Sequence, residues 1–265
     1  MCSNTHTVID SENIPIKLWL KKEQMDEGAL QQARNLANLP FAFKHIAIMP
    51  DTHQGYGMPI GAVLATKGVI IPNAVGVDIG CGMCSLRTTL TAIDTDALKE
   101  IVQRIRATVP VGFAHHATAQ DERLMPERKG HLPIVEQEYN NALYQIGTLG
   151  SGNHFIEIQQ GSDGYIWIMV HSGSRNLGFT VANHYHQIAR QLNATDGQTL
   201  TTDLAYIPQS SEYFELYSNE MNYCLAFALA NRTLIMERVK TAFKQVLPEV
   251  EFADFINKPH NFAAE

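Results

Sequence analysis

The chain lacks long hydrophobic runs, and it is poor in cysteine. No apolar stretch approaches the ~18 residues that a transmembrane helix needs, and residues 1–10 lack the basic-then-apolar order of a secretory signal. We therefore expect a cytoplasmic protein with no membrane partner. Four cysteines in 265 residues are too few and too scattered for a disulfide framework, so we expect free thiols unless one binds a metal. These cysteines are Cys2, Cys81, Cys84 and Cys224.

Positive charge is also scarce. The chain carries 20 Lys and Arg against 27 Asp and Glu, a formal net charge of -7. A nucleic-acid partner would therefore have to be held by a local basic patch, because the global field repels phosphate. The polar segment 114–132, which contains Arg123, Arg128, Lys129 and His131, is the best candidate for such a patch. A hydrophobic content of 45% excludes a disordered chain.

The hydrophobic periodicity predicts both helices and strands, without a regular β–α alternation. This pattern favours an α+β fold, with mixed sheets and surrounding helices in a single domain over residues 1–265. The predicted helices cover residues 24–39, 94–109 with Asp94 as N-cap, 178–192 and 212–247. Strands are predicted at 45–49, 155–158 and 165–170, the last two joined as a hairpin by the turn 161–164.

The densest cluster of chemically useful residues lies within the glycine-rich stretch 75–83. Asp78 and Cys81 stand three residues apart with glycines on both sides, so one tight turn can aim a carboxylate and a thiolate at a single point. This spacing is consistent with a transition-metal site, and equally with a glycine turn that buries Cys81 as a small hydrophobe. Cys81 and Cys84 resemble half of a zinc knuckle, but no second pair exists, which argues against a four-cysteine zinc site.

Two further segments place histidines at strand ends. His154 lies just before the first strand of the predicted hairpin and His171 just after the second, so the two side chains are expected to be close together. Ser172, Ser174 and Arg175 follow His171 and precede a helix, a position suited to binding phosphate. Taken singly, each histidine is more often a hydrogen-bonded core or cap residue.

Two other segments are less informative by themselves. Asp51 and His53 follow a predicted strand and either fix a metal ligand or form a local turn. His260 and Asn261 lie near the end of the chain, where a frayed tail is the usual finding.

In their order along the chain, these motifs resemble the RtcB-type RNA ligases. The resemblance runs from about residue 45 to the last residue, and several ordered matches make chance an unsatisfactory explanation. The matching stretches are M-P-D-T-H-Q-G (49–55), I-I-P-N-A-V-G-V-D-I-G-C-G-M (70–83), L-G-S-G-N-H-F-I-E-I (149–158), H-S-G-S-R (171–175), M-N-Y-C-L-A-F-A-L-A-N-R (221–232) and H-N-F-A-A-E (260–265).

The resemblance implies an enzyme that joins RNA ends bearing a 2′,3′-cyclic phosphate or 3′-phosphate to 5′-hydroxyl ends, using GTP and two Mn²⁺ ions in a central cleft. The implied metal ligands, with Cys81 bridging the two ions, are Asp78, Cys81, His154, His171 and His260. The implied nucleotide contacts are Asn153, His154, Phe155, Ile156, Glu157, His260 and Asn261. Weaker assignments, near the phosphates or behind the ligands, are Asp51, His53, Ser174 and Arg175.

The resemblance also implies a catalytic histidine that becomes guanylylated and that lies well beyond the H-N-x-A stretch. No unmatched histidine of this chain has a matching context, so we assign no catalytic residue and expect a C-terminally incomplete ligase domain. Two alternatives remain open. One is a metal-dependent cyclic phosphodiesterase or hydrolase, and the other is a non-catalytic fragment that binds metal or RNA ends.

Overall fold

The computed structural model describes residues 6–194 and 202–265, so Cys2 lies outside the described residues. The predicted mixed α+β fold is confirmed. The chain folds into two compact units, each built from segments that are distant in sequence. The first contains residues 1–75 and 184–215, and the second contains residues 76–183 and 216–265.

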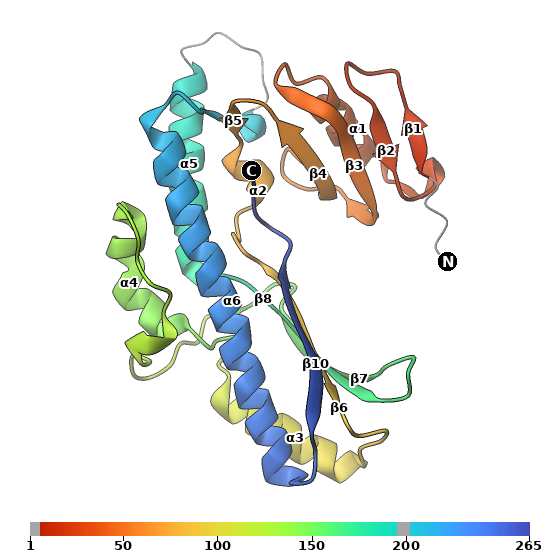
Figure 1. Cartoon of the computed structure of the whole chain (residues 1–265), viewed down its shortest axis with the longest axis vertical. Helices are drawn as coiled ribbons and strands as arrows, with labels where there is room; N and C mark the ends of the chain where they lie inside the picture. The colour runs from red at the N-terminus through yellow and green to blue at the C-terminus, as the bar shows by residue number, and fades with distance from the viewer. Residues whose placement is uncertain (1–5, 195–201) are drawn as a thin grey trace. The chain divides into compact units, whose positions relative to one another are not determined.

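The first unit is built on a four-stranded sheet with the order β1-β2-β3-β4 (Figure 1). Its strands are β1 (Thr7–Ile9), β2 (Ile16–Leu18), β3 (Ala42–His53) and β4 (Ile60–Thr66). Helix α1 (Glu27–Ala37) begins at its N-cap Asp26, whose side chain accepts a hydrogen bond of 2.8 Å from the Ala29 amide. The helix packs on one face of the sheet (Figure 1), where its alanines and leucines meet Ile16, Leu18 and Ile46.

Short elements complete the first unit. Strands β5 (Val69–Ile70) and β9 (Ile207–Pro208) pair antiparallel. The remaining short elements are η1 (Lys22–Gln24), α2 (Pro72–Val75) and η3 (Thr202–Leu204).

The second unit contains an antiparallel sheet with the order β10-β6-β8-β7. Its strands are β6 (Gly82–Thr88), β7 (Phe155–Gln160), β8 (Ile166–Ser172) and β10 (Phe252–Pro259). The predicted hairpin is confirmed, since β7 and β8 pair with Phe155 opposite His171. Strand β10 was not expected from the residues alone, and its pairing with β6 brings the end of the chain to the start of β6.

Helices cover this sheet. Helix α3 (Thr95–Thr108) begins at Asp94, as predicted, and α6 (Glu212–Val246) is the predicted long helix. The two helices pack with the sheet around one hydrophobic core that includes Ile101, Ile168 and Ile235 (Figure 1). None of the helices in the described ranges is long and apolar enough to cross a membrane.

The remaining helices differ from the sequence expectations in their extent. Helix α5 (Arg175–Ala194) begins three residues before the predicted start, and α4 (Pro133–Gln145) was not predicted. The buried carboxylate of Glu220 on α6 accepts hydrogen bonds from the first amides of α4, Ile134 at 2.7 Å and Val135 at 2.8 Å. A partner distant in sequence therefore caps α4, whose own N-cap Leu132 offers no side-chain acceptor. The polar segment that precedes α4 carries η2 (Glu122–Leu124).

Candidate metal centre

The turn from Asp78 to Cys81 lies directly before β6 and supplies two of the predicted ligands. The Cys81 amide donates to the Asp78 carbonyl at 3.0 Å, and Gly80 between them has a φ of 77°, which side chains other than glycine rarely adopt. Backbone hydrogen bonds connect this turn to the residues that follow β10. Gly80 donates to the Asn261 carbonyl at 2.7 Å, and the His260 amide donates to the Cys81 carbonyl at 2.8 Å.

The hairpin supplies two histidines whose rings are fixed by backbone carbonyls. Nδ1 of His154 lies 3.0 Å from the Leu149 carbonyl, and Nδ1 of His171 lies 2.9 Å from the Asn153 carbonyl. Since a carbonyl oxygen only accepts, each Nδ1 carries the hydrogen. In the neutral ring, Nε2 then presents a lone pair toward the turn, as a metal-ligating histidine does.

The five predicted ligand side chains converge, and they do so in two groups that share Cys81. Asp78, Cys81 and His154 form one group, and Cys81, His171 and His260 form the other, with all ligand atoms of a group within 4.8 Å of one another. Cys81 Sγ lies 3.4 Å from His154 Nε2 and 3.2 Å from His171 Nε2. His154 Nε2 lies 3.1 Å from Asp78 Oδ2, and the Nε2 atoms of His171 and His260 lie 3.3 Å apart.

These separations fit bound cations. Metal–nitrogen and metal–sulfur bonds of about 2.0–2.3 Å in tetrahedral coordination separate the ligand atoms by roughly 3.3–3.8 Å. The observed separations of 3.1–3.4 Å lie at or just below the short end of this range. Imidazole, carboxylate and thiolate together are ligands that first-row transition metals accept. The residues present therefore fit two metal ions, with Cys81 as the ligand common to both.

Burial and neighbouring groups shift the pKa values of these side chains. Burial alone would raise the pKa of Asp78, but the neighbouring His154 ring and a hydrogen bond from the Ser174 amide outweigh it and leave the pKa below its usual value. Burial lowers the pKa of His171, so the ring is neutral near pH 7. Burial and the nearby Asp78 carboxylate raise the pKa of the Cys81 thiol. A bound cation would oppose this last effect, because a coordinated thiol is deprotonated.

The chain is similar in sequence to proteins of known name. A sequence model of the family described as tRNA-splicing ligase RtcB matches residues 32–265. The chain belongs to the RtcB family. It is 38% identical to the RNA-splicing ligase RtcB of Escherichia coli K12, over 97% of this chain and 69% of that protein. It is 32% identical to the tRNA-splicing ligase RtcB of Thermococcus kodakarensis, over 92% of this chain and 62% of that protein.

In this RtcB-family chain, a buried arginine on α6 connects the segments that carry the ligands. Arg232 is fully buried, and its Nη1 donates to the Gly80 carbonyl at 2.7 Å and to the Ser172 carbonyl at 2.9 Å. Its Nε donates to Asn257 Oδ1 on β10 at 2.7 Å. One guanidinium thus joins the Asp78–Cys81 turn, the end of β8 after His171 and the strand that leads to His260.

The neighbouring Asn231 connects the remaining segment. Its Oδ1 accepts from the Gly147 amide at 2.6 Å, and its Nδ2 donates to the Thr148 and Gly173 carbonyls at 3.3 and 3.1 Å. Sequence reasoning did not assign Asn231 or Arg232 a role in the site. The available signal was an Asn–Arg pair inside the apolar stripe of a long helix, where a buried polar residue needs a partner.

Glycine at position 173 is required by close approach. A Cβ atom at Gly173 would overlap the Asp78 carboxylate. Ser174 follows it, and both its amide (3.0 Å) and its hydroxyl (3.2 Å) donate to Asp78 Oδ1, which leaves Oδ2 for the metal group. Ser174, predicted near the phosphates or behind the ligands, thus lies behind a ligand.

The structure places the other predicted residues around this centre or outside it. Arg175 has a positive φ of 60° and donates from Nε to Thr148 Oγ1 at 3.2 Å, with its guanidinium against Gly150. The side chain of Asn261 donates to the Asp78 carbonyl at 3.3 Å. Asp51 and His53 lie on β3 in the first unit, where His53 Nδ1 is 3.1 Å from the Asp51 carbonyl. Their role stays a prediction.

The predicted nucleotide contacts on β7 differ in their surroundings. The Phe155 ring lies 5.5 Å from the His171 ring, centroid to centroid. Ile156 packs partly buried against the hydrophobic core, whereas Asn153 and Glu157 are exposed. Nucleotide binding by these residues stays a prediction.

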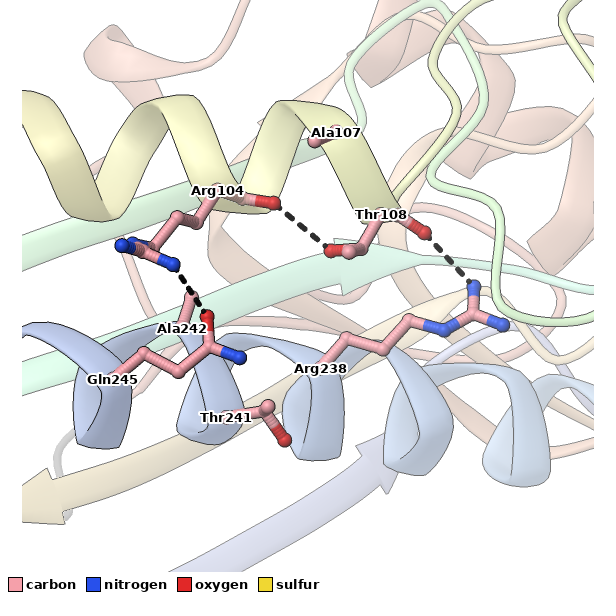
Figure 2. A pocket seen from close by; sticks show the side chains of 7 residues that line it. All are labelled: Arg104, Ala107, Thr108, Arg238, Thr241, Ala242 and Gln245. Atoms are coloured by element: carbon pink, nitrogen blue, oxygen red, sulfur yellow. Dashed lines mark hydrogen bonds between the residues drawn. The ribbon is translucent and has the colours of Figure 1, made fainter.

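A separate hollow of about 280 Å³ lies between α3 and α6 (Figure 2). Its polar groups bond within the protein. Arg104 pairs with Glu100 at 2.6 Å and donates to Gln245 at 2.9 Å, while Arg238 donates to the Gly147 carbonyl at 2.6 Å. The hollow contains none of the predicted site residues. It is lined by Arg104, Ala107, Thr108, Arg238, Thr241, Ala242 and Gln245.

Proposed function

We propose that this chain is an RNA ligase that joins a 2′,3′-cyclic phosphate or 3′-phosphate RNA end to a 5′-hydroxyl end, with GTP and two Mn²⁺ ions. Membership of the RtcB family supports RNA ligation, since the relatives of known name are RNA- or tRNA-splicing ligases. The metal dependence is supported by the ligand geometry in the second unit.

The observation that carries the proposal is the position of Cys81. Its sulfur belongs to both ligand groups, so one thiolate can bridge two cations. Two cations held close together would stabilise the negative charge that develops on the attacking and leaving oxygens of phosphoryl transfer. The mixed nitrogen, oxygen and sulfur donors also accept zinc, so manganese would be selected by geometry and availability.

The residues of the chain hold this arrangement before any substrate arrives. Ser174 fixes one oxygen of Asp78, and the Leu149 and Asn153 carbonyls fix the two hairpin histidines. We propose that the nucleotide contacts are made by residues 153–157 and by the pair His260–Asn261. Arg175, whose guanidinium lies against Gly150 near the ligand segments, is proposed to bind phosphate.

Ligation is tested with two short RNAs, one ending in a 2′,3′-cyclic phosphate and the other starting with a 5′-hydroxyl. A joined strand formed by the chain with Mn²⁺ and GTP, seen on a denaturing gel, would support the proposal and would mean that the chain itself supplies a guanylylated residue that the sequence did not assign. Opening of the cyclic phosphate without GTP and without joining would favour a hydrolase instead. RNA binding without any turnover would favour a non-catalytic module.

The metal centre is tested separately by counting Mn²⁺ bound after dialysis. We expect two ions in the native chain, none bound tightly in Cys81→Ala and one in His260→Ala. Cys84→Ala is the matched control, because Cys84 is also a buried thiol but belongs to neither ligand group. Equal losses in Cys81→Ala and Cys84→Ala would reject the bridging role.

A further inference from the structure

The segment 114–132, expected to carry a basic patch, has much of its positive charge in ion pairs. In the polar segment 114–132, Arg123 pairs with Asp121, and Lys129 pairs with Glu127 at 3.0 Å. Arg128 lies over the Tyr139 ring at 4.1 Å. Two of the basic residues singled out in this segment are therefore paired with acidic neighbours, which weakens the positive field available to an RNA strand.

Unpaired positive charge gathers instead on the first sheet. Alternation along the strands puts Ile16, Leu18, Ile46 and Ile48 on the face that α1 covers. The opposite face, here called the open face, carries Val8, Lys17, Trp19, His45 and Val63. The pairings Val8–Lys17, Lys17–Ala47 and Ala47–Val63 place these strands side by side across it. No helix of the first unit in the described ranges packs on this face.

Several lysines elsewhere in the chain are ion-paired, whereas Lys21, Lys22 and Lys258 form no ion pair within the described residues. Lys99, Lys240 and Lys244 each lie within 3.3 Å of a carboxylate oxygen. Lys17 on the open face, and Lys44 and Lys67 at its edge, form no ion pair within the described residues. Burial and then the charges of Lys17, His6 and Lys44 lower the pKa of His45, so these cations lie near one another.

Aromatic rings accompany the charges. Trp19 is 36% exposed and is stacked with the His6 ring at 5.2 Å between centroids. Lys67 Nζ lies 4.1 Å above the Phe43 ring, and Lys44 Nζ lies 5.4 Å from it. Val63 adds an apolar side chain that is 59% exposed. Basic groups interleaved with exposed rings bind the phosphates and the bases of single strands, respectively.

We propose that the open face binds single-stranded RNA, with Lys17, Lys44 and Lys67 contacting phosphates and a base stacking on Trp19. Charge complementarity carries the choice of ligand, because these lysines form no ion pair among the described residues of a chain whose net charge is -7. Half of the sheet, β1 and β2, precedes the residues that the RtcB family model matches. The proposal rests on RNA as the substrate class but does not depend on the metal centre.

The test measures binding of a fluorescein-labelled single-stranded oligoribonucleotide by polarisation, with EDTA present so that the metal centre does not contribute. The triple variant Lys17→Gln/Lys44→Gln/Lys67→Gln should bind at least about tenfold more weakly. The control Lys99→Gln/Lys129→Gln/Lys244→Gln removes the same charge from ion-paired lysines and should change the affinity less than about twofold. Equal losses in both triples would overturn the proposal.

Stacking is tested through tryptophan fluorescence. The chain has two tryptophans, so Trp167→Phe leaves Trp19 as the sole reporter. RNA should quench it, and Trp19→Ala should weaken binding about tenfold. Equal affinity for a duplex, no quenching, or a concentration-dependent dimer that Val63→Lys abolishes would overturn the proposal. Ligation at saturating RNA should persist in the triple variant, whereas its failure in the native chain would count against the proposed function alone.

Discussion

The metal centre of the second unit and the open face of the first unit differ in the burial and the partners of their positively charged side chains. Arg232 is fully buried and donates three hydrogen bonds to backbone and side-chain oxygens. Lys44 and Lys67 are exposed, and they touch an aromatic ring but no carboxylate among the described residues. A buried cation acts through fixed geometry, whereas exposed cations act through a field that salt can screen.

The largest expected effect comes from removing the buried cation. Arg232→Met leaves the Gly80 and Ser172 carbonyls and Asn257 without their donor, which should lower the free energy of unfolding by about 3 kcal/mol or more. Mn²⁺ affinity should fall about 100-fold, because three ligand-bearing segments lose their common anchor. Urea unfolding and Mn²⁺ titration give the two values, and Arg232→Lys should recover part of both.

The matching change on the open face should leave the fold intact. Lys17→Met is expected to alter the free energy of unfolding by no more than about 0.5 kcal/mol and to leave Mn²⁺ binding unchanged. If Lys17→Met lowered the free energy of unfolding as much as Arg232→Met, the cations of the open face would be structural like Arg232, contrary to the comparison.

The second largest effect should come from Gly173→Ala. The added methyl group would displace the Asp78 carboxylate, so the ion held by Asp78, Cys81 and His154 should bind about 30-fold more weakly. The ion held by Cys81, His171 and His260 should be less affected, which a two-site titration resolves. Gly173 is not among the glycines with a positive φ, so the effect is expected from the overlap with Asp78 and not from backbone strain.

Added salt should weaken RNA binding at the open face by a similar factor and leave Mn²⁺ binding at the metal centre nearly unchanged. Three phosphate contacts give a slope of about -2 for the logarithm of RNA affinity against the logarithm of salt concentration. RNA binding should therefore weaken roughly 20-fold between 50 and 200 mM NaCl. Mn²⁺ binding should change far less, since its ligands are mostly buried. RNA binding that does not respond to salt would contradict the lysine contacts.

The smallest expected effect is that of Ser174→Ala. The hydroxyl bond to Asp78 is lost, but the stronger amide bond at 3.0 Å remains. We expect about a fivefold loss of Mn²⁺ affinity, in line with one hydrogen bond of about 1 kcal/mol. A loss as large as that of Gly173→Ala would show that the hydroxyl, rather than the amide, orients the carboxylate.

The elements predicted best were those whose signals are local. Asp94 caps α3, the turn 161–164 joins β7 and β8, and the uninterrupted periodicity from Glu212 marks α6. Helix α4 was missed because its cap is Glu220, 86 residues from Ile134. Strand β10 was missed because its mostly exposed sequence shows no regular alternation of apolar and polar residues and becomes a strand only by pairing with β6.

The sequence by itself determined the ligand types, since a carboxylate, a thiol and histidines stand beside glycines and strand ends, and the order of the motifs identified the family. The tertiary structure decided which of these side chains lie close enough to share an ion and that Arg232 binds their segments together. It also decided which of the described lysines lack a carboxylate neighbour among the described residues. The physical reason is distance. Local signals act over a few residues, whereas coordination, burial and ion pairing depend on atoms a few ångströms apart that can be far apart along the chain.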